Sequence, residues 1–173
     1  MKRTVPKVLK RTVPKVLTTN VLFCGTGGQG VLSAAEVLSW AAIYDGYHVK
    51  KSEVHGMAQR GGSVESHVRF GVRVYSPLIP EGTADYLVSF LKDESLRMRP
   101  MLRSRGVDLT TDLEKAHGTI EEKKFLNSYL LGVLSRHVPI SEASWFLAID
   151  TVFAKKNPQG NKDAFLRGRG EMK

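Results

Sequence analysis

A glycine-rich segment near the start of the chain has the spacing of a ligand-binding loop. The apolar run NVLFC at 20–24 leads into GTGGQG at 25–30, which fits the pattern G-x-G-x-x-G. Glycines at this spacing allow a tight turn and close backbone approach, and the N-terminus of a following helix offers free N–H groups to an anion. The pattern therefore favours a ligand that carries phosphate. The residues expected to contact it are Gly25, Gly27, Gly28, Gln29 and Gly30.

Three interpretations of this loop remain open. It can bind a dinucleotide, bind another phosphate-bearing group such as part of coenzyme A, or serve mainly helix–strand packing or subunit contact. A dinucleotide site also needs an acid at the end of the second strand to hold the ribose. Glu53 lies near that place, but Lys50 and Lys51 precede it and nothing later supplies the second half of a dinucleotide fold. NAD or FAD is therefore disfavoured.

A second polar segment, HGMAQRGGS at 55–63, carries the other candidate site residues. Arg60 can bind a carboxylate or phosphate in a bidentate manner, or it can be a solvated loop arginine. His55 can titrate near neutral pH, although a hydrogen-bonded loop histidine is the simpler interpretation. We take His55 and Arg60 as candidates for catalysis. The remaining candidates for ligand contact are Gln59, Gly61, Gly62 and Ser63, together with Arg60.

The elements around these loops indicate an α/β fold. The run 20–24 predicts a buried strand, the pattern of 31–44 predicts a helix that Gly46 ends, and 47–54 predicts a second strand. A strand, helix and strand in this order predict a right-handed crossover between parallel strands. The two polar segments should then line one crevice at the carboxyl ends of the strands.

The rest of the chain adds strands and then helices. Residues 64–70 alternate, which predicts a strand with one wet face, and 72–75 suggest a hairpin partner for it. Another strand is expected at 85–90, and Asp93 can cap a short helix that ends before Pro100.

Helices are also expected at 125–135 and after the N-cap Ser141, whereas 107–118 has no clear pattern. The predicted fold is a single Rossmann-like domain with a mixed, largely parallel sheet flanked by helices.

The formal charge of +9 resides at the two ends of the chain. Residues 1–17 hold six basic side chains and no acid, and 155–173 hold six against two acids, so the remaining body is nearly neutral. A nucleic-acid-binding domain would carry its basic residues on a folded face, so this class of protein is excluded.

We divide the chain into a basic extension (1–19), the α/β domain (20–156) and a loosely held basic tail (157–173). The extension contains the repeat KRTVPKVL twice, which suggests a flexible segment, with an edge strand or a partner-binding arm as the alternatives.

The 173 residues, 42% of them hydrophobic and 25% charged, suit one soluble domain. No run reaches the roughly 18 apolar residues of a membrane span, and no secretory signal is evident, so we expect a cytoplasmic protein. The single thiol, Cys24, cannot hold an iron–sulfur cluster by itself. It can be reactive, but a small buried residue at a strand end is favoured.

Three motifs in fixed order give the sequence a specific family resemblance. GTGGQGVLSAAEVL, EVHGMAQRGGSVESHVRFG and SPLIPEGTADYLVSF resemble the beta subunit of indolepyruvate:ferredoxin oxidoreductases, over residues 20–90. This subunit is the gamma-type domain of the wider pyruvate and 2-oxoacid:ferredoxin oxidoreductase family. The similarity resumes more weakly at 125–135 and continues to 164–168, while the stretch near 103–113 is shorter than the family pattern.

The resemblance implies oxidation of a 2-oxoacid with coenzyme A as co-substrate and ferredoxin as electron acceptor. In the family, thiamine diphosphate with magnesium and iron–sulfur clusters do the chemistry. This chain has neither a thiamine motif nor a set of cysteines, so these cofactors belong on a larger partner subunit, and ferredoxin is reached through the complex. The resemblance implies no metal site here and no membrane partner. The alternative is a stand-alone nucleotide- or coenzyme A-binding module without catalysis.

Overall fold

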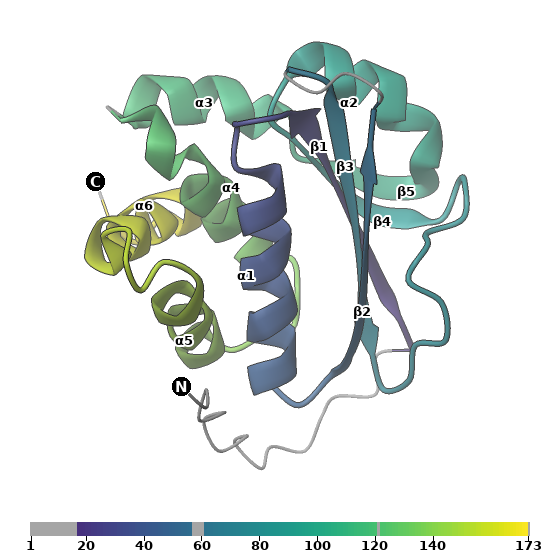
Figure 1. Cartoon of the computed structure of the whole chain (residues 1–173), viewed down its shortest axis with the longest axis horizontal. Coiled ribbons are helices and arrows are strands. Elements are labelled where there is room, and N and C mark those ends of the chain that lie inside the picture. Colours follow the sequence, from purple (N-terminus) through teal and green to yellow (C-terminus); the bar gives the residue numbers. More distant parts are fainter. Residues whose placement is uncertain (1–16, 57–60, 121, 173) are drawn as a thin grey trace.

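A five-stranded mixed sheet in the order β2-β3-β1-β4-β5 lies at the centre of the fold (Figure 1). The computed structural model describes residues 17–56, 61–120 and 122–172, without the side chain of His55. The predictions for residues 1–16, with most of the tandem repeat, lie outside this range. The strands are β1 (Thr19–Thr26), β2 (His48–His55), β3 (Ser63–Gly71), β4 (Ala84–Ser89) and β5 (Leu102–Asp108). The α-helices are α1 (Val31–Tyr44), α2 (Lys92–Met98), α3 (Thr111–Thr119), α4 (Leu126–Ser135), α5 (Glu142–Val152) and α6 (Pro158–Arg169). Short 3₁₀ turns precede β5 and α4 at Arg99–Met101 and Lys123–Phe125.

Strand β1 is the middle strand and is buried on both faces. Val21 and Phe23 join the main core with α1, whereas Leu22 and Cys24 join a smaller core on the opposite face. That smaller core includes Met98 of α2. A strand enclosed on both sides needs a continuous apolar sequence, which explains the run at 20–24.

As predicted, α1 connects β1 to β2 by a crossover, but β3 lies between these two strands in the sheet. Strand β1 pairs antiparallel with β3 and parallel with β4, and β2 pairs antiparallel with β3. Strands β1 and β2 therefore run in the same direction without touching, and only β3 opposes the other four. The prediction of a mixed sheet in an α/β domain is confirmed. The simple picture of β1 and β2 as neighbouring parallel strands is wrong, because the hairpin β2–β3 inserts β3 between them.

The predicted wet face of β3 is covered rather than solvated. Arg69 donates from Nη1 to the carbonyls of Ser76 and Leu78, at 2.9 Å each, and the N–H of Ile79 donates to Nδ1 of His67 at 3.2 Å. The segment 72–83 therefore lies over this face, and 72–75 is not the hairpin strand that we expected. The alternating sequence of β3 predicted that one of its faces meets solvent. Instead, the polar side chains on that face form hydrogen bonds with the backbone of the loop that covers it.

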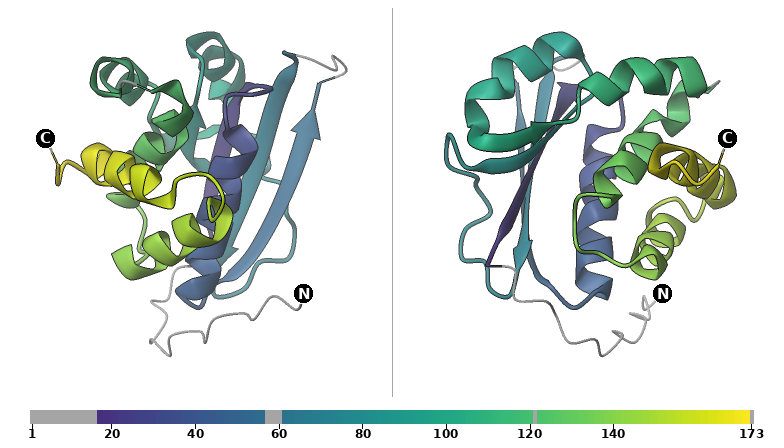
Figure 2. Two further views of the ribbon diagram at one scale, coloured as in Figure 1. Left: turned by 60° about the vertical axis from the view of Figure 1, so that its left-hand side comes forward. Right: turned by 180° about the vertical axis from the view of Figure 1, so that it is seen from behind.

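The short stretch near 103–113 contains most of an edge strand of the sheet. This strand, β5, pairs parallel with β4, with an irregularity between Ala84 and Tyr86. The right-hand view of Figure 2 shows α2 on the opposite side of the sheet from α4, α5 and α6, and β5 is the edge strand of that sheet. The segment 107–118, which has no clear sequence pattern, thus contains the end of β5 and α3 up to its last residue but one.

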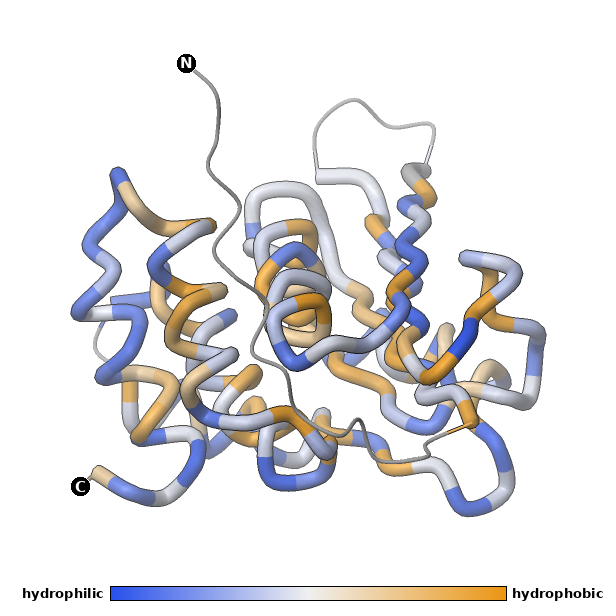
Figure 3. The backbone as a smooth tube through the Cα atoms, turned by 90° about the horizontal axis from the view of Figure 1, so that it is seen from below, coloured by the Kyte–Doolittle hydropathy of each residue, from blue (hydrophilic) through white to orange (hydrophobic). Residues whose placement is uncertain are grey.

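Helix α1 lies against the sheet, and α4, α5 and α6 form a further layer on its outer side (Figure 1). A buried carboxylate joins two of these helices, since Asp45, the C-cap of α1, accepts from the hydroxyls of Ser141 (2.6 Å) and Ser144 (2.9 Å) at the start of α5. The predicted N-cap is confirmed, because Ser141 Oγ accepts from the N–H of Ser144. In Figure 3, hydrophobic and hydrophilic residues alternate along the outer helices, as expected for helices buried on one side.

The chain beyond Asn157 is not loosely held, contrary to our expectation. Helix α6 is capped by Asn157, which accepts from the N–H of Gly160, and it buries Ala164 and Phe165. It also crosses α4 at very close range. A Cβ on Gly132 would lie 2.0 Å from the carbonyl oxygen of Phe165, and one on Gly168 would lie 2.0 Å from that of Tyr129. Gly168, in the segment expected to be loose, is thus a contact point between α6 and α4.

None of the helices in the described part of the chain is long and apolar enough to cross a membrane.

This helix crossing can be tested with Gly168→Ala. We expect it to lower the free energy of unfolding by about 1–3 kcal/mol, because the backbones must separate to admit the methyl group. Gly118→Ala in α3 is the matched control, since no atom lies within 4 Å of its added Cβ. It should stabilise the chain by up to about 1 kcal/mol. Urea denaturation followed by circular dichroism measures both, and equal stability of the two variants would contradict the crossing.

Candidate functional site

The glycine loop links the end of β1 to the start of α1 and is braced by its own glutamine. Gln29 Oε1 accepts from the N–H of Thr26 at 2.8 Å, and Nε2 lies 3.5 Å from the carbonyl oxygen of Phe90 at the end of β4. Gly28 and Gly30 have φ angles of 93° and 87°. These angles lie in the left-handed region, which favours glycine. Gln29, a predicted ligand contact, is thus engaged in holding the loop.

A side chain at Gly25 would force its neighbours to shift. A Cβ there would lie 2.8 Å from Oε1 of Gln29, 2.9 Å from Val31 and 3.0 Å from Phe90. The first glycine of the motif is therefore needed for packing at the junction of β1, α1 and β4. By contrast, no atom of the described residues lies within 4 Å of a Cβ on Gly28, so they leave space at the tip of the loop.

The two predicted polar segments meet, as their placement after β1 and β2 implies. The N–H of Gly27 donates to the carbonyl of Gly62 at 3.1 Å, and Thr26 pairs with Ser63 across β1 and β3. Residues 57–60, which include the candidates Gln59 and Arg60, lie outside the described residues, as does the side chain of His55. The described ends of the second segment nevertheless place it beside the glycine loop.

Ser63 belongs to a polar network that joins β3 to α2. Its hydroxyl donates to Oε2 of Glu94 at 2.5 Å and accepts from Arg97 at 2.6 Å, and Arg97 Nη1 lies 2.8 Å from Glu65. The pKa of Glu65 is lowered by His67, whose Nε2 lies 3.9 Å away, and by Arg97, against the opposing effect of burial. Glu94 and Glu65 in turn raise the pKa of Arg97. Ser63 therefore fixes the end of the loop and is not a free ligand contact.

Cavities flank the glycine loop on two sides. One of about 250 Å³ lies toward Val64, and one of about 690 Å³ lies between the loop and the helices of the second half of the chain. The larger cavity is lined partly by side chains that the sequence did not mark as functional. Those with polar or charged groups are Ser33, His117, Lys123, Lys124, Asn127 and Lys156. Among these residues, only the neighbouring Lys123 and Lys124 before α4 form a pattern in the sequence that could have indicated a site. Two adjacent lysines are, however, also common in solvated turns.

The described residues do not provide donors for the family's cofactors. They contain no group of three or more His, Cys, Asp or Glu side chains placed to hold a metal ion. Cys24 is fully buried, and burial raises the pKa of its thiol to about 12, so it is a packing residue, as predicted. This donor set does not fit a magnesium–diphosphate complex or an iron–sulfur cluster.

Comparison with known proteins places this arrangement in a family. The family model for pyruvate ferredoxin/flavodoxin oxidoreductase matches residues 20–112. The chain belongs to this family. The match covers the glycine loop, the second polar segment and the network at α2.

Curated relatives in this family carry names from the same branch as the sequence motifs. The indolepyruvate oxidoreductase subunit IorB of Thermococcus kodakarensis is 50% identical over 91 residues, which are 53% of this chain and 45% of that protein. The IorB subunit of Pyrococcus horikoshii is equally similar over the same shares. The chain thus matches somewhat under half the length of these relatives.

A solved structure has the same fold. The gamma subunit of a keto/oxoacid ferredoxin oxidoreductase from Geobacter sulfurreducens superposes with a TM-score of 0.72 at 22% identity, covering 88% of this chain and 97% of that one. The predicted fold class is confirmed, including the helical half that the family model does not reach.

Arg97 supplies the positive charge at the centre of the polar network, and its removal should destabilise the chain. We expect Arg97→Met to lower the free energy of unfolding by about 1 kcal/mol, a value reduced because the side chain is half exposed. Arg99→Met is the control, because Arg99 is exposed and forms no ion pair with the described residues; its effect should stay within about 0.5 kcal/mol.

The effect of Arg97→Met should also depend on pH. The pKa of Glu65 is lowered in the folded state. Ionised Glu65 therefore stabilises the fold above the ordinary glutamate pKa, and this stabilisation is lost as pH falls through the lowered pKa. Urea titrations at neutral and acid pH should therefore show a difference from the wild type that shrinks in acid. A difference that is constant with pH would contradict this role.

The Cys24 thiol should be unreactive in the native chain. Its thiolate is negligible at pH 8, because burial raises the pKa to about 12, and the sulfur is inaccessible to reagents. We expect no labelling by a chromogenic disulfide reagent at pH 8 and complete labelling in denaturant. Rapid labelling of chain that remains folded by circular dichroism would show that the thiol is accessible.

Proposed function

We propose that this chain is the small, gamma-type subunit of a 2-oxoacid:ferredoxin oxidoreductase of the indolepyruvate branch. The observation that carries the proposal is the junction of the two motif loops, where Gly27 N–H meets the Gly62 carbonyl at the carboxyl end of β1. Both loops lie within the family match and within the segments that resemble indolepyruvate enzymes. In open α/β sheets, this end of the strands is where ligands bind.

In the proposed reaction, a 2-oxoacid such as indolepyruvate loses carbon dioxide and two electrons. The electrons pass to ferredoxin, and the acyl group is transferred to the thiol of coenzyme A. Thiamine diphosphate with magnesium and the iron–sulfur clusters are assigned to a larger partner subunit, because the donors described above do not suit them. The small subunit would complete the active-site cleft, and ferredoxin would be reached through the complex in the cytoplasm.

We assign contact with coenzyme A to the glycine loop and to the second polar segment. A distant structural neighbour, the 2-oxoglutarate:ferredoxin oxidoreductase from Magnetococcus marinus, was solved with coenzyme A bound (TM-score 0.73, 17% identity, covering 89% of this chain and 31% of that one). In this proposal Arg60 binds an anionic group of the substrates, and His55 is a candidate for proton transfer.

Co-expression with a thiamine-dependent large subunit tests the proposal. The adjacent gene is the first candidate, provided that it encodes a thiamine motif and ferredoxin-like cysteine runs. We expect a stable complex that reduces ferredoxin when supplied with an aryl-pyruvate and coenzyme A, and no activity from either chain alone. Failure of the chain to associate with any such subunit would reject the proposal and favour a stand-alone binding module.

Within that complex, Arg60→Ala should lower turnover about tenfold or more, because a charge-assisted contact to an anion is lost. The melting temperature should not change. Lys155→Ala is the control, since Lys155 is exposed and lines neither cavity of the glycine loop. Equal turnover of the Arg60 variant and the wild type would remove Arg60 from the site.

A further inference from the structure

The loop 72–83, which joins β3 to β4 and which we call the strap, is buried at two points. Its buried residues are Val74, which is 2% exposed, and Ile79, which is 4% exposed. Ile79 belongs to the small core that contains Cys24 of β1. The strap also carries exposed large apolar side chains, those of Val72, Tyr75 and Leu78. The strap is therefore anchored to the fold through Val74 and Ile79, while most of its apolar surface faces outward.

At each anchor the backbone N–H of the strap donates to a histidine. The N–H of Val74 lies 2.9 Å from Nδ1 of His48 on β2, and that of Ile79 lies 3.2 Å from Nδ1 of His67 on β3. A backbone N–H can only donate, so this pattern assigns no proton to either Nδ1 and makes both imidazoles neutral. The two hydrogen bonds therefore exist only while His48 and His67 are uncharged.

Protonation turns each of these acceptors into a donor. An imidazolium carries a hydrogen on both ring nitrogens, so its Nδ1 opposes the N–H of the strap instead of accepting from it. At His67, which is 5% exposed, the change leaves the N–H of Ile79 buried without its acceptor, which is costly. Histidine is the side chain that changes charge between about pH 5 and 8, so both hydrogen bonds are lost within a moderate range of pH.

The charged groups around His48 are positive. His48 and Lys50 lie on the same face of β2, because successive side chains of a strand alternate, and Lys50 lies opposite Arg69 of β3. From the strap, Arg73 directly precedes the anchored Val74. A charged His48 therefore joins a group of like charges. The repulsion is modest because His48 is exposed, but it acts in the same direction as the loss of the acceptor.

Around His67 the charged groups come from β3 and α2. The Nε2 atom, which carries the hydrogen in the neutral form, lies 3.9 Å from Oε2 of Glu65, and Arg97 of α2 also pairs with Glu65. Arg69 follows on the same face and donates through Nη1 to two carbonyls of the strap. The residues opposite His67 on the neighbouring strands are uncharged, namely Ser52 and Leu22. Because Arg69 stays charged at every pH in this range, its two hydrogen bonds persist when the histidines are protonated.

We propose that the strap is a pH-sensitive latch, closed by neutral His48 and His67 and released at these two anchors when both are protonated. Arg69 keeps its hydrogen bonds to the strap, so the strap opens at its anchors and stays tethered between them. Opening withdraws Ile79 from the small core. It also moves the exposed apolar side chains of the strap, so the surface that the chain presents to other molecules depends on pH.

Hydrogen exchange of single amides in the full chain, followed by nuclear magnetic resonance, tests the latch. After correction for the intrinsic pH dependence of exchange, the N–H groups of Val74 and Ile79 should lose protection about tenfold or more between pH 8 and pH 5. The N–H of Phe90, which donates to the carbonyl of Cys24 at 2.9 Å, should stay protected at both pH values. Unchanged protection of the strap, or a parallel loss at Phe90, would overturn the proposal.

Two double variants separate the latch from other effects of acid. His48→Asn/His67→Asn supplies an amide oxygen as acceptor that is not protonated at pH 5, so the strap should stay closed at both pH values. His48→Leu/His67→Leu removes both acceptors, so the strap should be open at both. Either variant should thus abolish the pH dependence of strap protection. If the wild-type pH dependence persists in either variant, the histidines are not the latch.

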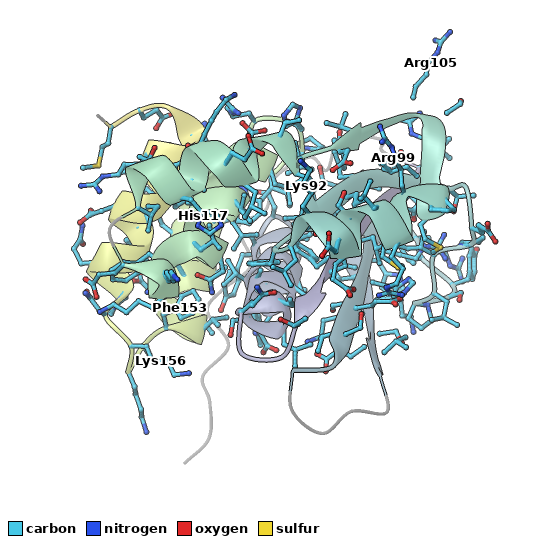
Figure 4. All side chains as sticks on the ribbon, turned by 90° about the horizontal axis from the view of Figure 1, so that it is seen from above. Lys92, Arg99, Arg105, His117, Phe153 and Lys156 are labelled. Atoms are coloured by element: carbon cyan, nitrogen blue, oxygen red, sulfur yellow. The ribbon has the colours of Figure 1, made fainter. Side chains whose placement is uncertain are left out.

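His117→Asn is the control, because it removes a histidine that lies away from the strap. His117 is exposed on α3, and Figure 4 shows it well away from Arg99. The strap ends close to Arg99, since the N–H of Gly82 donates to the carbonyl of Pro100 at 3.1 Å. The control should keep the full pH dependence of the strap amides. Loss of that dependence in the control would contradict the assignment to His48 and His67.

Discussion

The packing of three elements onto the bare α-carbon of Gly25 is the constraint on which the site depends. Gln29, Val31 and Phe90 bring the glycine loop, the start of α1 and the end of β4 together at this point. A side chain here would force these three neighbours to shift at the point where α1 begins. The middle position of β1 makes this junction effective, because β1 is hydrogen-bonded on both edges and buried on both faces.

Two different kinds of contact therefore shape the carboxyl end of the sheet. On one side, ion pairs and a hydroxyl tie Ser63 to α2, and this network gives the second polar segment a fixed end. On the other side, the loop opens toward a cavity whose far wall is helical and basic. A fixed anchor beside an open, charged space is an arrangement in which a loop can meet a ligand.

Local pattern predicted the elements with strong periodicity, and tertiary contacts decided the rest. The helix at 31–44, the N-cap Ser141 and the meeting of the two glycine segments followed from spacing and capping alone. The position of β3 did not, because strand order depends on pairing and not on the alternation within a strand. Gly132 lay in a predicted helix and Gly168 in a tail expected to be loose, and only the structure shows that two backbones touch at these glycines.

The open edge of β2 has a consequence for how the molecule behaves among its own copies. Among the described residues, β2 pairs only with β3, so its outer backbone groups have no partner within the sheet. An uncovered strand of this length is a template for pairing between chains, and aggregation follows when its side chains are apolar. Here Lys50 is exposed, and Lys51 of the same strand forms ion pairs with Glu36 of α1 and with Glu53 of β2. Charges at this edge disfavour stacking of identical sheets, so the strand can stay open without committing the protein to self-association.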